Sequence, residues 1–225
     1  MMASPADLED FGVGFSLSEG IVRSVDEIRD LEVAVSDLGV EVRMWLAPGR
    51  RGELAARRRH LAGPTGCGLC GVESLSEAVR PASIVSGESF AVAGPDLLAA
   101  MDDLADAQEI GRLTRAMHAA ALWREGRRLL VREDVGRHNA LDKLIGATAR
   151  LGGVDDGVVL LTSRVSVEMV QKAAALGAPV ICAVSAPTAL AVRVADQANL
   201  TLVAVTRADG FEVFTHPQRI DLRCA

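Results

Sequence analysis

Short, uninterrupted apolar runs alternate with amphipathic stretches in the last third of the chain. The runs are Val158–Leu161, Pro179–Val184 and Leu200–Val205, and the stretches between them are Val165–Leu176 and Thr188–Ala198. Apolar runs of this length predict buried strands, and apolar spacing of three and four residues predicts helices. We therefore expect a βαβαβ unit with a buried parallel sheet. Phe211–Thr215 follows a turn-forming Ala-Asp-Gly and is expected to add an antiparallel edge strand.

Weaker patterns precede this unit. The predicted elements are a helix from Ser4 (N-cap) to Glu19, a hairpin of 31–35 and 40–46, a partly helical segment 50–60, helices 74–79 and 95–110, a hairpin of 119–124 and 127–132, and a helix 139–151. Capping residues and turn-forming Gly and Asp set these boundaries. We expect one α/β domain over residues 1–225, in which residues 1–62 could form an N-terminal subdomain.

Composition narrows the class of protein. The 225 residues are 49% apolar and 24% charged, with a net charge of −6 and only 3% aromatic residues. An acidic chain is a poor general binder of nucleic acid, and so few aromatic residues cannot build a base-stacking platform. No window approaches the roughly 20 apolar residues of a membrane span, and the N-terminus lacks a signal-peptide pattern. We expect a cytoplasmic protein with neither a nucleic-acid nor a membrane partner.

Two of the four cysteines, Cys67 and Cys70, form a Cys-x-x-Cys pair within the sequence GCGLCG. The same letters match a dinucleotide-binding glycine pattern, but RRRHLAGP precedes them where that motif requires a strand. A zinc site needs further ligands, and His118 lacks the Glu two residues later that a deaminase would carry. We therefore expect no metal.

The glycines on both sides of Cys67 and Cys70 predict accessible sulfur atoms, and the nearby arginines favour the thiolate. This arrangement suits a sulfur that travels between two partners. The alternative is a surface loop with incidental cysteines. Arg50, Arg51 and residues 57–59 also form a basic patch, which is either a solvated helix face or a docking surface for an acidic or phosphorylated partner.

Polar residues also gather where strands are expected to end. Segment 132–139 reads REDVGRHN, and a turn alone does not require Asp134, Arg137 and His138 together. Ser163 and Ser185 follow two of the predicted parallel strands. Ligands bind at the carboxyl ends of such strands, where helix N-termini favour phosphate, although both serines could be ordinary N-caps.

Taken together, five motifs resemble the FdhD family of formate dehydrogenase accessory sulfurtransferases. They are TGCGLCG from Thr65, REDVGRHNALDKLIG from Arg132, SRVSVEMVQKA from Ser163, VSAPTALAV from Val184 and FTHPQR from Phe214. The resemblance covers nearly the whole chain. It departs from the family in a missing N-terminal extended segment and in Arg115-Ala116-Met117, where family members tend to have Gly-Gly.

The resemblance implies a three-layer α/β/α fold with a cytidine-deaminase-like mixed sheet, no catalytic zinc and a small N-terminal α+β portion. It implies a cytoplasmic homodimer that passes persulfide sulfur from a cysteine desulfurase to the bis-molybdopterin guanine dinucleotide cofactor of formate dehydrogenase. Cys67 then carries the persulfide with Cys70 as its companion, which either relays or resolves the sulfur. The implied cofactor-binding stretch is Phe214, Thr215, His216, Pro217, Gln218 and Arg219.

From these motifs we expect a guanine nucleotide such as GDP, a mimic of the cofactor, to bind near Ser163, Ser185 and the stretch 214–219, with a phosphate contact from Arg219. The rival hypothesis is a cofactor chaperone that binds and delivers the cofactor without carrying sulfur.

Overall fold

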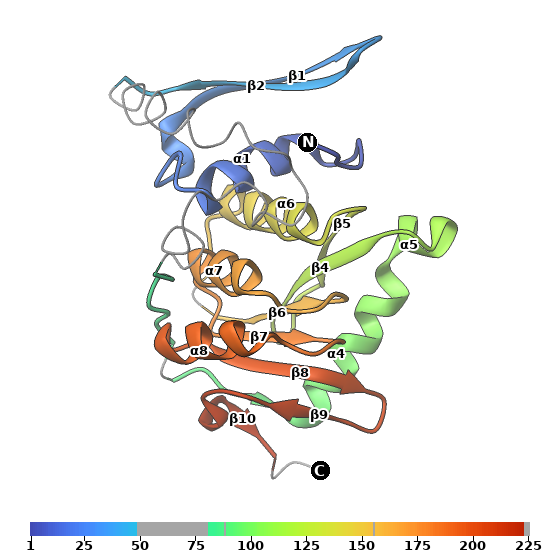
Figure 1. Ribbon diagram of the computed structural model, residues 1–225, viewed down its shortest axis with the longest axis vertical. Coiled ribbons are helices and arrows are strands. Elements are labelled where there is room, and N and C mark those ends of the chain that lie inside the picture. The colour runs from blue at the N-terminus through green and yellow to red at the C-terminus, as the bar shows by residue number, and fades with distance from the viewer. Residues whose placement is uncertain (49–80, 88, 155, 223–225) are drawn as a thin grey trace.

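A six-stranded mixed sheet forms the centre of the computed structural model, which describes residues 1–48, 81–87, 89–154 and 156–222. Side by side, its strands are β5 (Leu130–Asp134), β4 (His118–Trp123), β6 (Val158–Leu161), β7 (Val180–Ala183), β8 (Thr201–Arg207) and β9 (Gly210–Val213). Strands β6, β7 and β8 run parallel, and all other neighbours are antiparallel (Figure 1). The predicted parallel unit and its antiparallel edge strand are confirmed.

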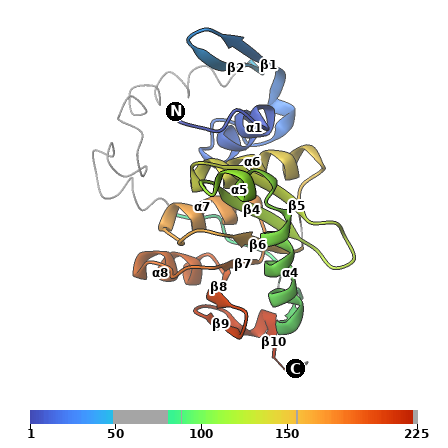
Figure 2. The same ribbon diagram turned by 90° about the vertical axis from the view of Figure 1, so that its right-hand side faces the viewer.

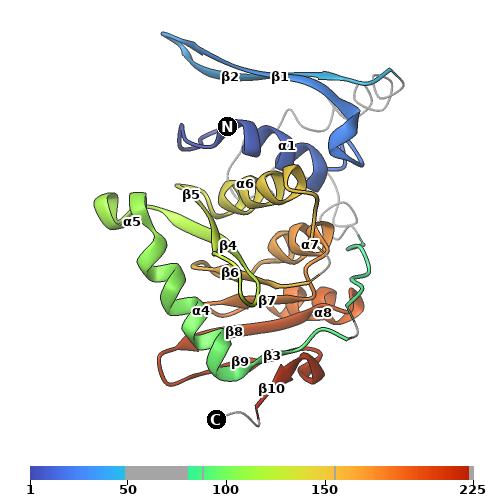
Figure 3. The ribbon, with the colours of Figure 1, turned by 180° about the vertical axis from the view of Figure 1, so that it is seen from behind.

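Helices cover both faces of this sheet (Figure 2). Helices α6 (Arg137–Arg150), α7 (Val167–Leu176) and α8 (Ala189–Gln197) lie on one face, and α4 (Gly94–Ala107) lies on the other, where it crosses the sheet in Figure 3. Successive side chains of β4 point to opposite faces of the sheet. Ala120 and Leu122 pack toward α6, α7 and α8, and Ala119 and Ala121 pack toward α4. The three-layer α/β/α prediction is confirmed.

An N-terminal layer lies against α6. It consists of α1 (Leu8–Ser18), a short turn η1 (Val25–Glu27) and a hairpin of β1 (Ile28–Ser36) and β2 (Gly39–Leu46), which matches the predicted hairpin. Helices α1 and α6 approach so closely that only glycine fits at two positions. A Cβ atom on Gly14 would lie 1.7 Å from the Asp142 carbonyl oxygen, and one on Gly146 would lie 1.9 Å from that of Asp10. These glycines set the distance between the two helices.

The first helix begins later than the sequence suggests. Ser4 is not its N-cap: the Ser4 backbone N–H donates to Asp134 Oδ2 at 2.9 Å, and its hydroxyl accepts from the Val135 N–H at 3.0 Å. Asp7, in a left-handed conformation, precedes the helix instead. A long-range contact with β5 thus overrides the local capping signal.

Other boundaries shift by a few residues. The predicted helix 95–110 is two helices, α4 and α5 (Glu109–Thr114), and the second strand of the predicted hairpin 119–132 starts at Leu130. The remaining short elements, β3 (Val92–Ala93), η2 (Pro217–Arg219) and β10 (Ile220–Asp221), lie near the C-terminal end, where β10 pairs with β3. Among the described residues, no helix has the length and apolar character needed to cross a membrane.

Candidate functional site

The carboxyl ends of the parallel strands form the edge of the sheet where chemically active side chains were predicted. The arrows of β6, β7 and β8 point toward this carboxyl edge in Figure 1. Because β4 runs antiparallel to β6, its first residue, His118, also lies there, and the adjacent Ala119 N–H donates to Thr162 Oγ1 at 2.8 Å. The end of β5 pairs with the start of β4, so Asp134 lies opposite His118. The N-termini of α6, α7 and α8 follow these strand ends.

Part of the polar segment 132–139 serves the packing of neighbouring helices. The Arg132 guanidinium donates to the Asp10 carboxylate of α1 at 2.7 and 2.9 Å. The buried Glu133 carboxylate accepts from the backbone N–H groups of Ile110 and Gly111 at 2.8 and 2.7 Å. It therefore holds the N-terminal end of α5, where an anion is favourable.

Asp134 is the centre of a second structural network. Its fully buried carboxylate lies 2.7 Å from Lys143 Nζ, which is also fully buried. The same carboxylate accepts from the N–H groups of Ser4 and Gly136 and from Asn139 Nδ2. These bonds satisfy both charges and fix the turn into α6. In the same segment, Arg137 Nε and His138 Nε2 are buried and bond to no other described residue.

At the carboxyl edge of the sheet, four half-buried residues carry buried polar atoms that bond to no other described residue. The atoms are Arg137 Nε, His138 Nε2, Ser166 Oγ and both carboxylate oxygens of Glu168. Arg137 and His138 open α6, while Ser166 and Glu168 open α7. We call these four residues the edge cluster. A buried polar group without a partner is costly, so the cluster needs an explanation.

Burial and charge hold the histidines at this edge neutral. Desolvation, reinforced by the Arg137 guanidinium, lowers the pKa of His138 to about 4, although Glu168 opposes the shift. Desolvation also lowers the pKa of His118, with further contributions from Arg137 and Arg164. The Arg137 guanidinium thus lowers the pKa of both histidines. At neutral pH each histidine offers one donor and one acceptor nitrogen.

One helical turn deeper, the same two helices meet in a satisfied ion pair. Asp142 follows His138 by four residues and Lys172 follows Glu168 by four, so each pair shares a helix face. Lys172 Nζ donates to both Asp142 oxygens, at 2.8 and 3.0 Å, and also to Ser18 Oγ. Burial raises the pKa of Asp142, while Lys172 opposes that shift. Where α6 packs against α7, the edge cluster thus lies at the N-termini of the two helices, and the charges one turn further along them are paired.

The two predicted serines lie at this edge but do not cap helices. Ser163 is buried and its hydroxyl donates to the Arg164 carbonyl oxygen at 3.0 Å. Helix α7 starts after Ser166 and α8 after Thr188, whose hydroxyl accepts from the Ala191 N–H. The alternative in which Ser163 and Ser185 are N-caps is therefore wrong. An extra loop turn, joined by the Val165–Pro187 bridge, separates each strand from its helix.

The stretch Phe214–Arg219 lies at the opposite, amino edge of the sheet. Thr215 Oγ1 donates to the Leu200 carbonyl oxygen and accepts from the Leu202 N–H, at the start of β8. The first residue of β8, Thr201, donates to the His216 carbonyl oxygen at 2.9 Å. His216 Nε2 lies 2.9 Å from the Asp196 carbonyl oxygen, at the end of α8. Phe214 packs on the core, whereas Pro217 and Gln218 are exposed.

Arg219 points into the protein. Its side chain is 1% exposed, and it donates to the Gly87 carbonyl oxygen and to Thr201 Oγ1, both at 3.1 Å. The expectation that Arg219 reaches a phosphate beside Ser163 and Ser185 is not met in this structure. The reason is topological: β9 returns antiparallel to β8, so the residues after it lie at the start of β8 rather than at its end.

Cys67, Cys70 and the arginines between 50 and 59 lie outside the described residues. Cys182 lies on β7, where burial raises its pKa to about 12 and its Sγ is 3.3 Å from Thr206 Oγ1. Such a thiol is protonated and inaccessible, so it is not a nucleophile.

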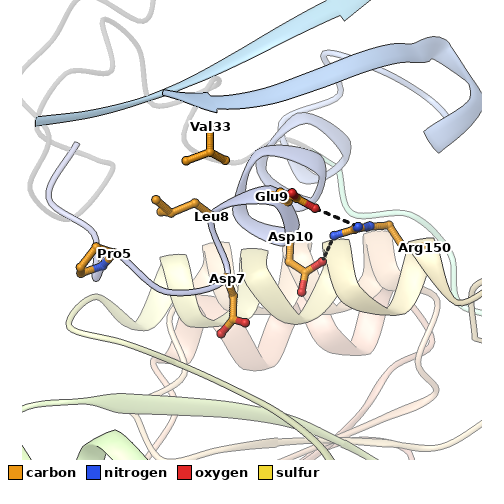
Figure 4. Close-up of a pocket in the computed structure, with 7 residues that line it drawn as sticks. All are labelled: Pro5, Asp7, Leu8, Glu9, Asp10, Val33 and Arg150. Carbon is orange, nitrogen blue, oxygen red and sulfur yellow. Dashed lines mark hydrogen bonds and ion pairs between the residues drawn. The ribbon is translucent and has the colours of Figure 1, made fainter. Parts of the chain in front are cut away.

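A cavity of about 340 Å³ lies at the N-terminal layer, and none of the predicted site residues that the structure describes lines it (Figure 4). It lies between the start of α1 and Val33 of β1, and Arg150 closes one side. The Arg150 guanidinium donates to Glu9 at 3.0 Å and to Asp10 at 2.7 Å, as the dashed lines in Figure 4 show. With its central charges paired to one another, the cavity shows no unmet binding group.

Sequence reasoning did not single out Ser166 and Glu168 as site residues. Both lie inside the motif SRVSVEMVQKA, which supported the family resemblance, and the apolar spacing there predicted a helix without assigning either residue a role. The sequence does contain one usable signal. Glu168 and Lys172 are four residues apart on one predicted helix, and His138 and Asp142 are four residues apart on another. This spacing places each polar pair on one face of its helix. That spacing does not reveal which of the two pairs stays unsatisfied.

Comparison with known proteins gives one consistent answer. The sequence model of the FdhD/NarQ family matches residues 1–221. The sulfur carrier protein FdhD of Agrobacterium fabrum is 54% identical over 99% of this chain and 83% of its own length, and that of Cupriavidus necator is 53% identical over 98% and 77%. A Desulfotalea psychrophila crystal structure, described as that of a formate dehydrogenase accessory protein, superposes with a TM-score of 0.73 at 26% identity and covers 97% of this chain and 82% of its own.

Proposed function

This chain belongs to the FdhD/NarQ family, and from that premise we propose that it is a sulfurtransferase. It takes persulfide sulfur from a cysteine desulfurase and passes it to the bis-molybdopterin guanine dinucleotide cofactor of formate dehydrogenase. The observation that carries the proposal is the identity of about half of all residues, over nearly the full chain, with proteins named sulfur carriers. The Cys-x-x-Cys pair supplies the required nucleophile.

The loading step is a thiol–persulfide exchange. The Cys67 thiolate attacks the outer sulfur of the desulfurase persulfide, the old S–S bond breaks, and the desulfurase cysteine leaves as a thiolate. Cys67 then carries the persulfide. The glycines on either side of Cys67 put no side chain in the path of the approaching partner.

Cys70 can act in two ways. As a relay, its thiolate attacks the outer sulfur of the Cys67 persulfide and takes over that sulfur. As a resolving thiol, it attacks the inner sulfur, which forms a Cys67–Cys70 disulfide and releases hydrosulfide with the two electrons that reduce the sulfur. Mass spectrometry without reductant distinguishes these roles, because only the second leaves an internal disulfide.

For cofactor binding we propose two separate contacts. The exposed Pro217 and Gln218, with His216 beside them, form the contact at the amino edge, and the buried Arg219 positions them. Ser163 and Ser185 belong to a contact at the carboxyl edge. The cofactor has two guanosine arms, so contacts on opposite edges are compatible with one cofactor. We also propose that the protein acts in the cytoplasm as a homodimer.

Transfer of labelled sulfur tests the proposal. After incubation with a cysteine desulfurase and cysteine, the wild-type protein should gain one sulfur on the peptide that contains Cys67. The Cys67→Ala variant should gain none and should fail to support formate dehydrogenase maturation, with an unchanged melting temperature. Cys182→Ala is the matched control, because its thiol is buried and protonated, and it should load sulfur normally.

The rival function, a cofactor chaperone that carries no sulfur, predicts the opposite result. Cyanide would release no sulfur from the desulfurase-treated protein, and Cys67→Ala would still support maturation. Those two observations together would reject the sulfurtransferase and retain a role in cofactor delivery.

A further inference from the structure

Helix α5 projects from the carboxyl edge of the sheet, beyond the ends of β4 and β5 (Figures 1 and 3). Leu113 on this helix is 86% exposed, and Arg112 and Arg115 on either side of it in the sequence are exposed as well. We call these three residues the α5 patch. A single exposed leucine is common on protein surfaces. The case for a contact therefore rests on how the patch is held, how it is charged and where it lies.

A buried acid holds the N-terminal end of α5 in place. Isolated helices shorter than about 12 residues are marginal in water, and α5 has six residues. The Glu133 carboxylate, which is 7% exposed, accepts from the backbone N–H groups of Ile110 and Gly111. A Cβ atom on Gly111 would lie 2.9 Å from Glu133 Oε1, so glycine permits this close approach. The patch is thus presented on a fixed support, which lowers the entropy cost of binding a partner.

The turn that follows α5 fixes its C-terminal end. Thr114 Oγ1 donates to the Ile110 carbonyl oxygen at 2.9 Å and accepts from the Ala116 N–H at 3.3 Å. Arg115 donates its N–H to the Gly111 carbonyl oxygen at 2.8 Å and has a φ of 54°, a conformation that glycine adopts without strain. A strained arginine at this position adds a second guanidinium group beside Leu113.

The α5 patch is basic, although the chain as a whole has a net charge of −6. The acid of the helix, Glu109, lies in its first turn, away from Arg115. None of the ion pairs among the described residues involves Arg112 or Arg115. An exposed leucine between two guanidinium groups complements an apolar pocket that carboxylates surround.

The place of the patch indicates which protein meets it. The turn after α5 leads into His118, and the next backbone N–H donates to Thr162 Oγ1 at 2.8 Å, beside Ser163. The patch therefore lies on the same edge of the sheet as the cofactor contact proposed for Ser163 and Ser185. A protein that takes the cofactor from this edge approaches the α5 patch. The desulfurase reacts with Cys67 and does not need to reach the cofactor.

We infer that the α5 patch is a docking surface for the formate dehydrogenase that receives the cofactor, with Leu113 entering an apolar pocket bordered by carboxylates. The inference rests on the proposed function, since it takes the recipient and the cofactor contact from there. A second copy of this chain is the less suitable occupant. A two-fold contact through the patch would bring the arginines of both copies together.

Binding of the full chain to the cofactor-free formate dehydrogenase of the same organism tests the inference by biolayer interferometry. Leu113→Asp should weaken binding at least about tenfold, because it removes the apolar anchor and adds a charge of the same sign as the pocket. Leu151→Asp is the matched control. Leu151 is 76% exposed and directly follows α6 at the opposite edge of the sheet, so this variant should keep the full affinity.

The charge of the patch is tested by a separate pair of variants. Arg112→Glu combined with Arg115→Glu should slow association about fivefold or more at low salt, and added salt should reduce the difference. The matched double reversal is Arg127→Glu combined with Arg128→Glu, in the exposed turn between β4 and β5 at the amino edge. It changes the net charge by the same amount and should leave association close to that of the wild type.

Equal affinity of the Leu113→Asp and Leu151→Asp variants, or no binding by the wild type, would overturn the inference. Two further measurements on Leu113→Asp also decide against it. A loss of desulfurase-dependent sulfur loading would assign the patch to the desulfurase, and a fall in solution mass from dimer to monomer would assign it to a second copy. The two proposals remain separable, because wild-type protein that loads no sulfur, together with weakened binding by Leu113→Asp, rejects only the sulfurtransferase.

Discussion

The stretch 214–219, at the amino edge of the central sheet, and the edge cluster, at its carboxyl edge, differ in how their polar atoms are bonded. At the amino edge, Thr215, His216 and Arg219 bond to neighbouring backbone or side-chain oxygens. At the carboxyl edge, the edge cluster keeps buried polar atoms without partners among the described residues. A satisfied network maintains a shape, whereas an unsatisfied one costs stability and is retained where a ligand completes it.

This contrast shows that one sequence motif can contain residues that hold the fold together with residues whose polar atoms have no described partner. FTHPQR was singled out as a binding stretch, yet half of its side chains build the turn that connects β9 to β10. In segment 132–139, Arg132, Glu133 and Asp134 support α1, α5 and α6, whereas Arg137 Nε and His138 Nε2 have no partner among the described residues. Residues that hold neighbouring elements and residues without a described partner therefore occur in the same motif, and only the contacts distinguish them.

The largest effect should come from the amino edge. Replacing Arg219 with Ala removes a buried side chain and leaves the Gly87 carbonyl oxygen and Thr201 Oγ1 without this donor. We therefore expect a loss of about 4 kcal/mol in the free energy of unfolding. Urea unfolding measures this. The control Arg193→Ala lies on the exposed face of α8 and should change stability by less than about 0.5 kcal/mol. A small effect of Arg219→Ala, with weakened GDP binding, would restore Arg219 as a ligand contact.

Lowering the pH should reduce the stability of the protein through His138, at the carboxyl edge. His138 has a pKa of about 4 in the folded protein and 6.5 as its ordinary value, so the unfolded chain binds the proton more readily between these values. Its contribution to stability is therefore fully present above pH 6.5 and is lost as the pH falls toward 4, by about 3 kcal/mol in total. Subtracting the pH profile of His138→Gln from that of the wild type isolates this loss. Parallel profiles would show that His138 protonates freely in the fold.

The sequence predicted the sheet well because its signals there are local. The apolar runs of β6, β7 and β8 and the helices between them are evident without tertiary information. The start of α1 was not, because the Ser4 bond to Asp134 spans most of the chain. The placement of stretch 214–219 could have been predicted: an antiparallel strand after β8 must return to the start of β8, so its far end cannot meet Ser163 and Ser185.

The edge cluster marks the limit of prediction from this sequence. Asp142 and Glu168 are both acids on the inner faces of adjacent helices, and each has a polar neighbour four residues away. One is paired with Lys172 and the other is not, because Lys172 can reach only one of them while it also bonds to Ser18 of α1. Whether a buried acid is satisfied thus depends on a third helix that is distant in the sequence.

The smallest expected effect distinguishes an orphaned carboxylate from a satisfied one. Glu168→Gln replaces a buried charge that has no described partner by a neutral group of the same size, so we expect the unliganded protein to gain about 1 kcal/mol of stability. Glu133→Gln is the matched change on a carboxylate that accepts two backbone N–H bonds, and it should lose about 1.5 kcal/mol. Urea unfolding of both variants without ligand gives the two signs. If both variants lose stability alike, Glu168 is a structural residue, and the two edges of the sheet do not differ in the way their contacts indicate.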